Sequence, residues 1–392
     1  MNKRQIYLDN AATTKICREA LEAYTEASEM HFGNPSSLHG IGVDAEHVIK
    51  NARADILRSL YSDKGEIIFT ASGTEANNLA ILGRARAKER FRSGAKIITS
   101  AGEHASVNAA LAQLEREGVR VARIPTAGGR LDMAALEREL SGDTVLVTLM
   151  LVNNETGAVY NIPEAAKTIK RKAPSAYLHV DATQGYLKIP FSPAAIGADL
   201  VTVSAHKIRG PKGIGALYMT ERVRTERGLS PIVFGGGQGL GLRSGTENVP
   251  AIAAFGAAAR IGHKSIESTA RALEQLRTML AEGIRGDELL CAISITDPEM
   301  HAPHILNITL PSIKSETMLH YLSSEGIFVS SGSACSSNSG HKSEALIAFG
   351  RSEDEADCSI RISFGAANTE DDVKALLAAL RSGLSKLARI KK

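Results

Sequence analysis

The sequence predicts an α/β fold in which a largely parallel sheet is covered by helices on both faces. Short runs rich in β-branched residues recur between residues 66 and 219, and segments with helical apolar spacing lie between most of them. Strands that alternate with helices form βαβ units, whose crossovers place neighbouring strands parallel. The predicted strands cover residues 66–70, 96–100, 119–124, 144–151, 177–181, 199–204 and 213–219.

Two helix starts can be predicted in detail. Ser72 and Glu75 form a capping-box pattern, in which Ser72 caps a backbone amide and Glu75 reaches back to the amide of the cap residue. Asp132 has the place of an N-cap, and Leu131 and Leu136 have the spacing of a hydrophobic staple around it. We therefore expect helices to begin after residues 72 and 132.

The texture of the chain changes near Pro250, where a long Ala-rich segment begins. A helix is predicted over 251–283, and the last helix is predicted to begin at Thr369 with a regular apolar stripe. Between them the pattern predicts a strand at 305–310, a helix at 316–325, a Ser/Gly loop at 330–340 and a strand around Arg361.

Composition excludes several classes of protein. The 392 residues include 46 Lys+Arg against 43 Asp+Glu, a net charge of +3 that is too balanced to hold nucleic acid or an anionic membrane electrostatically. The longest apolar stretch, 145–152, is far shorter than the roughly 20 residues of a membrane span, and no signal sequence is recognisable. The cysteines, Cys17, Cys291, Cys335 and Cys358, have no metal-ligand spacing. We expect no metal, reduced thiols and a cytoplasmic location.

Asp181 and Lys207 follow two of the predicted strands. Lys207 lies in a glycine-rich turn, so it is either an exposed turn lysine or an amine that condenses with an aldehyde cofactor. Asp181 is either a turn former or the carboxylate that keeps a pyridine nitrogen protonated. Because the carboxyl ends of neighbouring parallel strands meet at one crevice, we expect the two side chains to lie together.

A third signal is the strand-to-helix turn at residues 71–77. The free amides of a helix start and its positive pole favour a phosphate group, and Gly73 allows the backbone to approach it closely. As a bare turn this pattern is weak. Together with Asp181 and Lys207 it supplies the anchor that a phosphorylated cofactor requires.

Several segments resemble the cysteine desulfurases of the NifS/IscS-like group, which belong to the class V aminotransferases and have the fold-type I architecture of pyridoxal-phosphate enzymes. The resemblance extends over nearly the whole chain. It rests on residues 7–14 (YLDNAATT), 32–42, 69–81, 103–104, 152–157, 179–185, 204–215, 235–248, 330–337 and 361–365, in the family's order.

This resemblance implies roles for individual residues around pyridoxal 5'-phosphate. Lys207 would carry the cofactor covalently and later move a proton between substrate and cofactor. Asp181 would pair with the pyridinium nitrogen, and Gln184 would donate a hydrogen bond to the ring hydroxyl. His104 would stack on the ring and take part in acid–base steps, although a histidine at this place is otherwise a core or capping residue.

The remaining implied roles concern the phosphate and the substrate. The residues expected to hold the phosphate are Thr74, Ser204 and His206, with Thr246 reaching across from the second subunit of a homodimer. Asn154 and Arg361 are expected to bind the substrate carboxylate, for which the planar guanidinium is well shaped.

Cys335 lies among small residues, in SSGSACSS at 330–337. A loop of this composition offers no core in which to bury a structural cysteine. An unperturbed thiol, with a pKa of about 8.5, is already a few per cent thiolate near neutral pH. The resemblance implies that Cys335 is the nucleophile that takes sulfur from the substrate.

We therefore expect a large cofactor-binding α/β domain at 15–255, with a mostly parallel seven-stranded sheet. A small α+β domain is expected from 1–14 plus 256–392. The implied reaction converts L-cysteine to L-alanine and leaves a persulfide on Cys335, for delivery to a sulfur-acceptor protein of iron–sulfur assembly or of tRNA or cofactor thiolation. A selenocysteine lyase or another class V enzyme would share Lys207 and Asp181, but an aminotransferase has no need of Cys335. A catalytically idle scaffold for assembly partners is a further alternative.

Overall fold

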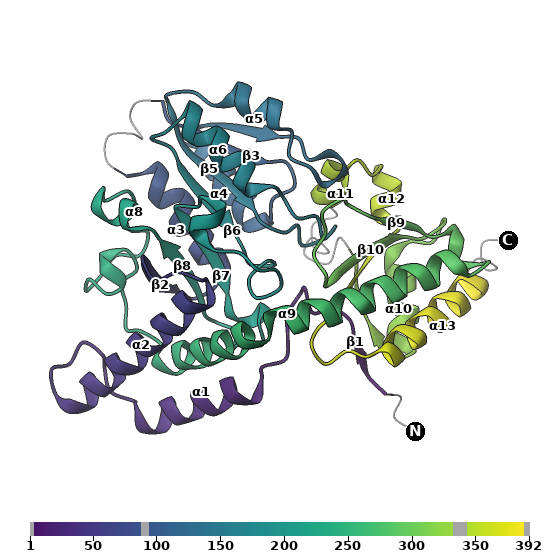
Figure 1. The fold of residues 1–392 in the computed structure, drawn as a ribbon, viewed down its shortest axis with the longest axis horizontal. Coiled ribbons are helices and arrows are strands. Elements are labelled where there is room, and N and C mark those ends of the chain that lie inside the picture. Colours follow the sequence, from purple (N-terminus) through teal and green to yellow (C-terminus); the bar gives the residue numbers. More distant parts are fainter. Residues whose placement is uncertain (1–3, 88–93, 332–342, 388–392) are drawn as a thin grey trace.

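The structure is a computed structural model that describes residues 4–87, 94–331 and 343–387. Its larger part is built on a seven-stranded sheet with the order β2-β8-β7-β6-β5-β3-β4 (Figure 1). The strands are β2 (Glu66–Thr70), β3 (Lys96–Ser100), β4 (Arg120–Ile124), β5 (Thr144–Met150), β6 (Tyr177–Asp181), β7 (Leu200–Ser204) and β8 (Gly215–Met219). In this sheet β8 runs against both of its neighbours, and the other pairings are parallel.

The predicted fold class, with its mostly parallel seven-stranded sheet, is confirmed. The strands predicted at 66–70, 96–100 and 177–181 have the observed bounds. The strand predicted from residue 213 begins instead at Gly215, because Gly213 adopts a positive φ of 80° and belongs to the preceding turn.

Helices cover both faces of this sheet, as the alternation of its buried residues requires. Ile67 and Phe69 of β2 face one apolar cluster, whereas Ile68 faces another. The first cluster contains side chains of α1 (Arg18–Met30), α2 (Gly40–Ser59), α5 (Met133–Glu139), α6 (Ile162–Lys172) and α7 (Pro193–Ile196). The second contains side chains of α3 (Gly73–Ala85), α4 (Ala105–Arg116) and α8 (Glu221–Thr225).

One long helix, α9 (Val249–Gly286), joins the larger and smaller parts of the molecule (Figure 1). Its N-cap is Asn248, whose side chain accepts a hydrogen bond from the amide of Ala251 at 3.2 Å. Ile266 packs into the core beneath the large sheet, and Leu273, two turns further on, packs into the core of the smaller part. The predicted domain boundary between residues 255 and 256 thus falls inside a continuous helix.

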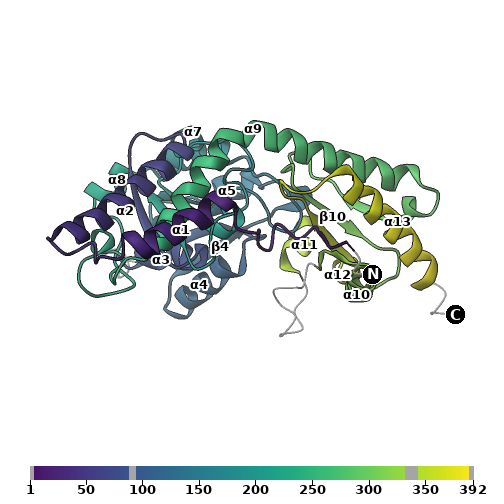
Figure 2. The ribbon, with the colours of Figure 1, turned by 90° about the horizontal axis from the view of Figure 1, so that it is seen from below.

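The smaller part contains an antiparallel sheet with the order β12-β13-β10-β9 and a parallel pair, β1-β11. Its strands are β1 (Ile6–Tyr7), β9 (Ser294–Thr296), β10 (Ile305–Thr309), β11 (Ile327–Phe328), β12 (Ser330–Ser331) and β13 (Ser359–Ser363). Its helices are α10 (Ser315–Ser324), α11 (Glu344–Phe349), α12 (Glu353–Asp357) and α13 (Glu370–Leu387). Ile6 and Leu8 belong to the core of this part, from which the chain crosses to α1 (Figures 1 and 2).

The two predicted helix starts have different outcomes. Asp132 caps α5, because its carboxylate accepts a hydrogen bond from the amide of Ala135 at 2.8 Å. Ser72 caps α3 as predicted, but the second half of the capping box is wrong: Glu75 accepts from the amide of Ala71, not from that of Ser72. The carboxylate of Glu75 also pairs with Arg243 at 2.7 Å, which fixes it away from the box geometry.

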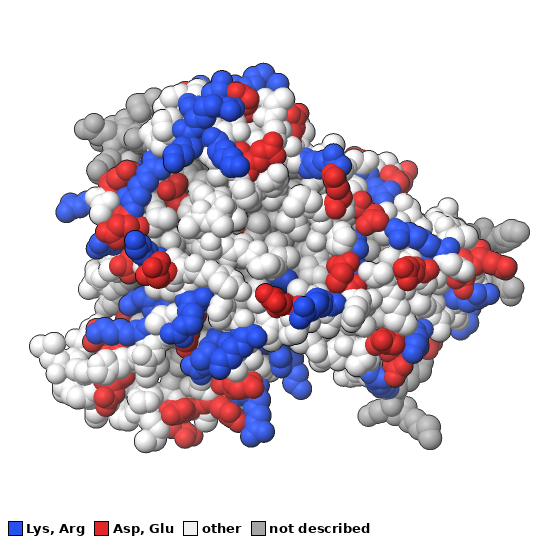
Figure 3. All heavy atoms as spheres, viewed as in Figure 1, with Lys and Arg blue, Asp and Glu red and all other residues white. Residues whose placement is uncertain are grey.

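The surface has charges of both signs. Basic and acidic side chains are interspersed over both halves of the face in Figure 3. On the surface of the large part, Arg171 and Lys172 both pair with Glu137. None of the helices in the described ranges combines the length and apolar character needed to cross a bilayer.

Candidate active site

The candidate site begins where β6 and β7 end. These parallel neighbours are in register so that Asp181 pairs with Thr202, and the short helix η3 (Ala205–Lys207) follows β7 directly. Asp181 and Lys207 therefore lie at the same edge of the sheet, as the sequence predicted. The η3 turn also carries His206.

Asp181 is buried and fully hydrogen-bonded. One carboxylate oxygen accepts from the side-chain amide of Asn77 at 2.8 Å, and the other accepts from the backbone amide of Thr183 at 2.9 Å. Asp181 is therefore a turn former, as one of the two alternatives predicted. The turn contact holds its carboxylate in place, which is compatible with a role in binding a cofactor. Asn77 donates to Ser106 as well, which links α3, β6 and α4 at this point.

Lys207 is half-buried beneath the N-terminal segment. Its Nζ donates to the carbonyl oxygens of Ala11 and Ala12, both at 2.6 Å. The carbonyl of Ala11 also accepts from Gln184 at 2.8 Å, and the Gln184 oxygen lies 3.4 Å from Nε2 of the buried His304. Residues 9–13 thus lie over the cofactor-binding candidates of the large sheet.

A cradle for an anion lies beside the start of α3. Ser204 is 2% exposed, and its hydroxyl has no hydrogen-bond partner among the described residues. A Cβ added to Gly73 would lie 3.3 Å from Oγ1 of Thr183 and 3.4 Å from Cβ of Ser204. The helix start, a buried unpartnered hydroxyl and a glycine in close contact form the kind of site that a phosphate occupies. Thr74 lies exposed in the first turn of the same helix.

Two histidines near this edge are held neutral. His104 caps α4, with Nδ1 accepting from the amide of Ser106 at 3.2 Å. Burial lowers the pKa of His104, and the charges of Asp181 and Lys207 act on it in opposite directions. Burial together with the charges of Lys207 and Lys212 lowers the pKa of His206 to about 4, and its Nδ1 lies 3.1 Å from the Thr13 hydroxyl. The capping alternative for His104 is therefore correct, and it leaves Nε2 to carry the ring proton.

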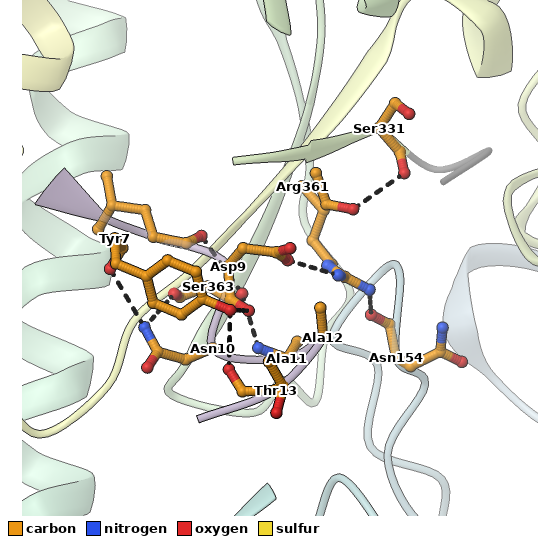
Figure 4. Close-up of polar contacts among 12 residues, drawn as sticks. Tyr7, Asp9, Asn10, Ala11, Ala12, Thr13, Asn154, Ser331, Arg361 and Ser363 are labelled. Atoms are coloured by element: carbon orange, nitrogen blue, oxygen red, sulfur yellow. Dashed lines mark hydrogen bonds and ion pairs between the residues drawn. The ribbon is translucent and has the colours of Figure 1, made fainter. Parts of the chain in front are cut away.

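Arg361 lies on β13, and its side chain points toward Asp9 and Asn154 (Figure 4). Asp9 belongs to the segment whose Ala11 and Ala12 carbonyls accept from Lys207. Arg361 is 7% exposed, and its guanidinium donates from Nη1 to the carbonyl of Asn154 at 2.9 Å and from Nη2 to Asp9 at 2.8 Å. Its Nε is buried and has no partner in the described part of the chain. The structure thus brings Asn154 and Arg361 together as the sequence predicted, with Asp9 as an additional neighbour.

The structure does not place the last two candidates, Thr246 and Cys335, in the site. Thr246 is exposed, and no hydrogen bond joins it to the Ser204 cradle within the described ranges. Cys335 lies outside the described residues. The strand that precedes it, β12, pairs Ser330 with Arg361, so Ser331 lies close to Arg361 (Figure 4).

Four residues near these groups were given no role from the sequence: Asp9, Asn77, Glu103 and His304. Asp9, Asn77 and Glu103 lie within the segments that carry the family resemblance. Asp9 and Glu103 each follow a short strand closely, which is a usable signal, whereas Asn77 lies within α3. Glu103 is fully buried, and burial raises its pKa to about 8. Its Oε1 accepts from the Ser100 hydroxyl at 2.5 Å and from the Met150 amide at 2.9 Å, whereas its Oε2 has no partner among the described residues.

Comparison with known proteins agrees with this arrangement. The aminotransferase class-V family matches residues 6–376. Cysteine desulfurase IscS 1 of Archaeoglobus fulgidus is 37% identical over 382 residues, 97% of each chain. Cysteine desulfurase IscS of Neisseria meningitidis is 36% identical over 390 residues, covering 99% of this chain and 94% of the relative.

Solved structures with the same architecture carry related names. A NifS-like protein superposes with a TM-score of 0.89 at 32% identity, covering 97% of this chain and 100% of that one. A structure described as SspA in complex with cysteine gives a TM-score of 0.78 at 32% identity, over 92% and 98% of the two chains. With a family match over nearly its full length and relatives above 30% identity, the chain belongs to the aminotransferase class-V family.

Proposed function

We propose that this protein is a pyridoxal-phosphate-dependent cysteine desulfurase that converts L-cysteine to L-alanine and leaves the sulfur on Cys335 as a persulfide. The observation that carries the proposal is that candidate residues from the two parts of the molecule lie close together. Asp181, Ser204 and Lys207 lie at one edge of the large sheet. Arg361 of the smaller part pairs with Asp9, in the same N-terminal segment whose Ala11 and Ala12 carbonyls accept from Lys207. The curated relatives that carry the name cysteine desulfurase support the same activity.

The residues at the sheet edge fit pyridoxal phosphate. The unpartnered Ser204 hydroxyl, the α3 start and the close approach at Gly73 suit its phosphate, with Thr74 and His206 as further donors. The fixed Asp181 carboxylate suits a protonated ring nitrogen, because Asn77 and the Thr183 amide hold both of its oxygens. When bound, the cofactor supplies an electron sink for the carbon that loses its proton.

Other side chains complete the cofactor site in this proposal. Lys207 holds the cofactor through its amine and afterwards moves the proton at the substrate Cα. Gln184 donates to the ring hydroxyl. His104, with Nδ1 committed to the helix cap, would stack on the ring and would offer Nε2–H for acid–base steps.

Arg361 and Asn154 bind the carboxylate of L-cysteine. The unpartnered Nε of Arg361 gives the substrate carboxylate a buried donor on a rigid strand. A carboxylate bound there places the rest of the amino acid between Arg361 and the large sheet.

Cys335 acts as the sulfur acceptor within the chain. It is four residues beyond Ser331, and an extended chain of that length reaches about 14 Å. Its thiolate attacks the substrate sulfur, the Cβ–S bond breaks as the S–S bond forms, and the carbon takes the electron pair and a proton. Cysteine and thiol thus become alanine and persulfide, without an added oxidant or reductant.

We also propose that the protein is a homodimer in the cytoplasm and hands its sulfur to an acceptor protein. Large apolar side chains are exposed on two segments, Phe32 and Leu38 on one and Phe234 and Leu240 on the other. Exposed apolar groups of this size mark protein contacts. Thr246 follows Phe234 and Leu240 closely in sequence. If a second copy covers this segment, Thr246 of the first copy would lie near the phosphate site of the second.

The direct test is incubation of the cofactor-loaded protein with L-cysteine and a reductant, with alanine and sulfide both measured. Equal amounts of the two products are expected. L-selenocysteine run in parallel separates a selenocysteine lyase, which would turn over that substrate and leave cysteine intact. Alanine formed from an added keto acid, with no sulfide, would identify an aminotransferase and contradict the proposal. A purified protein that stays colourless with added cofactor would point to an idle scaffold.

A further inference from the structure

Asp9 has a place in the site that the proposed function does not use. Its carboxylate lies against Arg361, the residue proposed to receive the substrate carboxylate, at 2.8 Å from Nη2. The carbonyl oxygen of Asn154 accepts a hydrogen bond from Nη1 (Figure 4). The Nε of Arg361 has no partner in the described part of the chain. Part of the guanidinium fork is thus already occupied by an anion.

The backbone around Asp9 is fixed, so the carboxylate stays beside Arg361. Asp9 forms a parallel bridge with Ser363 on the same strand as Arg361. Its carbonyl accepts from the amide of Ala12 at 3.0 Å and from the hydroxyl of Tyr7 at 3.0 Å. A substrate carboxylate that reaches Arg361 therefore meets Asp9 as a permanent neighbour.

Other charged groups around Arg361 are less directly placed. The charge of Arg361 lowers the pKa of the Glu155 carboxyl and opposes the larger effect of burial, which raises it. Glu155 accepts a hydrogen bond from Ser343, and within the described ranges Asp9 is the carboxylate in an ion pair with Arg361. Buried His304 lies in the field of Arg361 and is kept neutral, because burial lowers its pKa. The fork is thus close to electrically balanced before substrate arrives.

We infer that Asp9 is a positioning residue that shares Arg361 with the substrate carboxylate. It orients the guanidinium so that Nε remains the open donor, and it offsets the positive charge of the fork. This inference rests on the proposed function of Arg361. The consequence is weaker binding of amino acids than an unshared guanidinium would give, together with rejection of simple inorganic anions.

The decisive variant is Asp9→Asn, which keeps an oxygen acceptor for Nη2 and removes the negative charge. In the cofactor-loaded enzyme its dissociation constant for L-alanine, measured by calorimetric titration, should fall about three- to tenfold. The KM for cysteine should fall with it. Sulfate, used as an anion without an amino group, should compete with L-alanine in the variant and not in the wild type.

Three further variants separate the effect of the Asp9 charge from its effect on the orientation of Arg361. Asp9→Ala removes the acceptor as well as the charge, so its L-alanine dissociation constant should lie above that of Asp9→Asn. Asp371→Asn, an equal loss of charge at a side chain 73% exposed on α13, should leave L-alanine binding at the wild-type value. Asp9→Ser supplies a second neutral acceptor, and circular dichroism verifies that each variant is folded.

The outcomes distinguish this inference from the proposed function. Wild-type protein that consumes cysteine, with neutral variants of Asp9 that bind L-alanine no more tightly, overturns the inference alone. Tighter binding in Asp371→Asn as well would also overturn it, because the effect would then be one of net charge. Wild-type protein that neither consumes cysteine nor binds L-alanine overturns the proposed function and this inference together.

Discussion

The two halves of the site are assembled in different ways. On the large sheet, Asp181, Ser204 and Lys207 come from the ends of two adjacent parallel strands, and hydrogen bonds from nearby elements fix Asp181 and Lys207. On the side of the smaller part, Asp9 and Arg361 are 352 positions apart and meet as an ion pair. One half follows from strand order, whereas the other requires the ends of the chain to come together.

This difference predicts a division of labour. Neutral hydrogen bonds and a buried carboxylate suit a cofactor that stays bound, because the groups need no rearrangement. A shared guanidinium suits a substrate that arrives and leaves, because a neighbouring carboxylate limits how tightly an anion is held. Changes on the sheet side should therefore affect cofactor binding, and changes around Arg361 should affect substrate binding.

The largest effect is expected at Lys207. Lys207→Ala should abolish turnover and the borohydride-trappable linkage to the cofactor, because η3 places Lys207 directly at the end of β7, where Ala11 and Ala12 accept hydrogen bonds from its amine. Peptide mapping after reduction measures the linkage. Lys212→Ala, an exposed lysine in the same turn, is the matched control and should retain it. Reduced pyridoxyl-lysine at wild-type yield in Lys207→Ala would show that another lysine carries the cofactor. The sheet edge would then not be the cofactor-binding half of the site.

Cys335→Ser should abolish sulfur transfer and leave cofactor binding intact. The cofactor spectrum and its response to cysteine should persist, since Lys207, Asp181 and Arg361 do not need the thiol. Alanine and protein-bound sulfane sulfur should fall at least about 100-fold, because a serine hydroxyl is not a nucleophile for sulfur at neutral pH. Cys291→Ser, at an exposed cysteine, serves as control. Wild-type rates of alanine and sulfide formation from Cys335→Ser would refute the assignment.

Thr246→Val tests whether the cofactor half is completed by a second subunit. Losing one hydrogen bond to a charged phosphate should cost about 1.5–3 kcal/mol, or roughly ten- to a hundredfold in cofactor affinity. Equilibrium titration of the cofactor-free protein measures this value, and Thr225→Val on α8 provides an exposed threonine as control. Unchanged affinity in Thr246→Val would mean that the phosphate is held by residues of one chain.

Glu103 allows a smaller test by pH. Its pKa is raised to about 8 by burial, so between pH 4.5 and 8 the folded protein keeps a proton that the unfolded chain has released. Rising pH should therefore destabilise the wild type relative to Glu103→Gln, by about 1.4 kcal/mol per pH unit in urea unfolding at pH 5.5 and 7.5. Glu115→Gln, on exposed α4 surface, should show no such dependence, because its pKa is lowered. Parallel curves for wild type and Glu103→Gln would show that Glu103 is ionised in the fold.

Much of the sheet half could be predicted from the sequence because its determinants are local. Short buried runs rich in apolar residues define strands such as 177–181, and a capping residue such as Asp132 fixes a helix start within a few positions. Parallel strand order then brings Asp181 and Lys207 to one edge. One departure is Glu75, where a distant partner, Arg243, changed a local capping pattern.

By itself, then, the sequence determined the α/β sheet, the edge at which Asp181 and Lys207 meet, and the family resemblance that pointed to Arg361 and Cys335. Only the tertiary structure decided that Asp9 pairs with Arg361, that Asn77 holds Asp181, and that Glu103 is buried with no cation paired to it among the described residues. Caps and strand patterns depend on backbone geometry over a few residues. The side chain that meets a buried charge depends on how distant strands pack, which no short window of sequence contains.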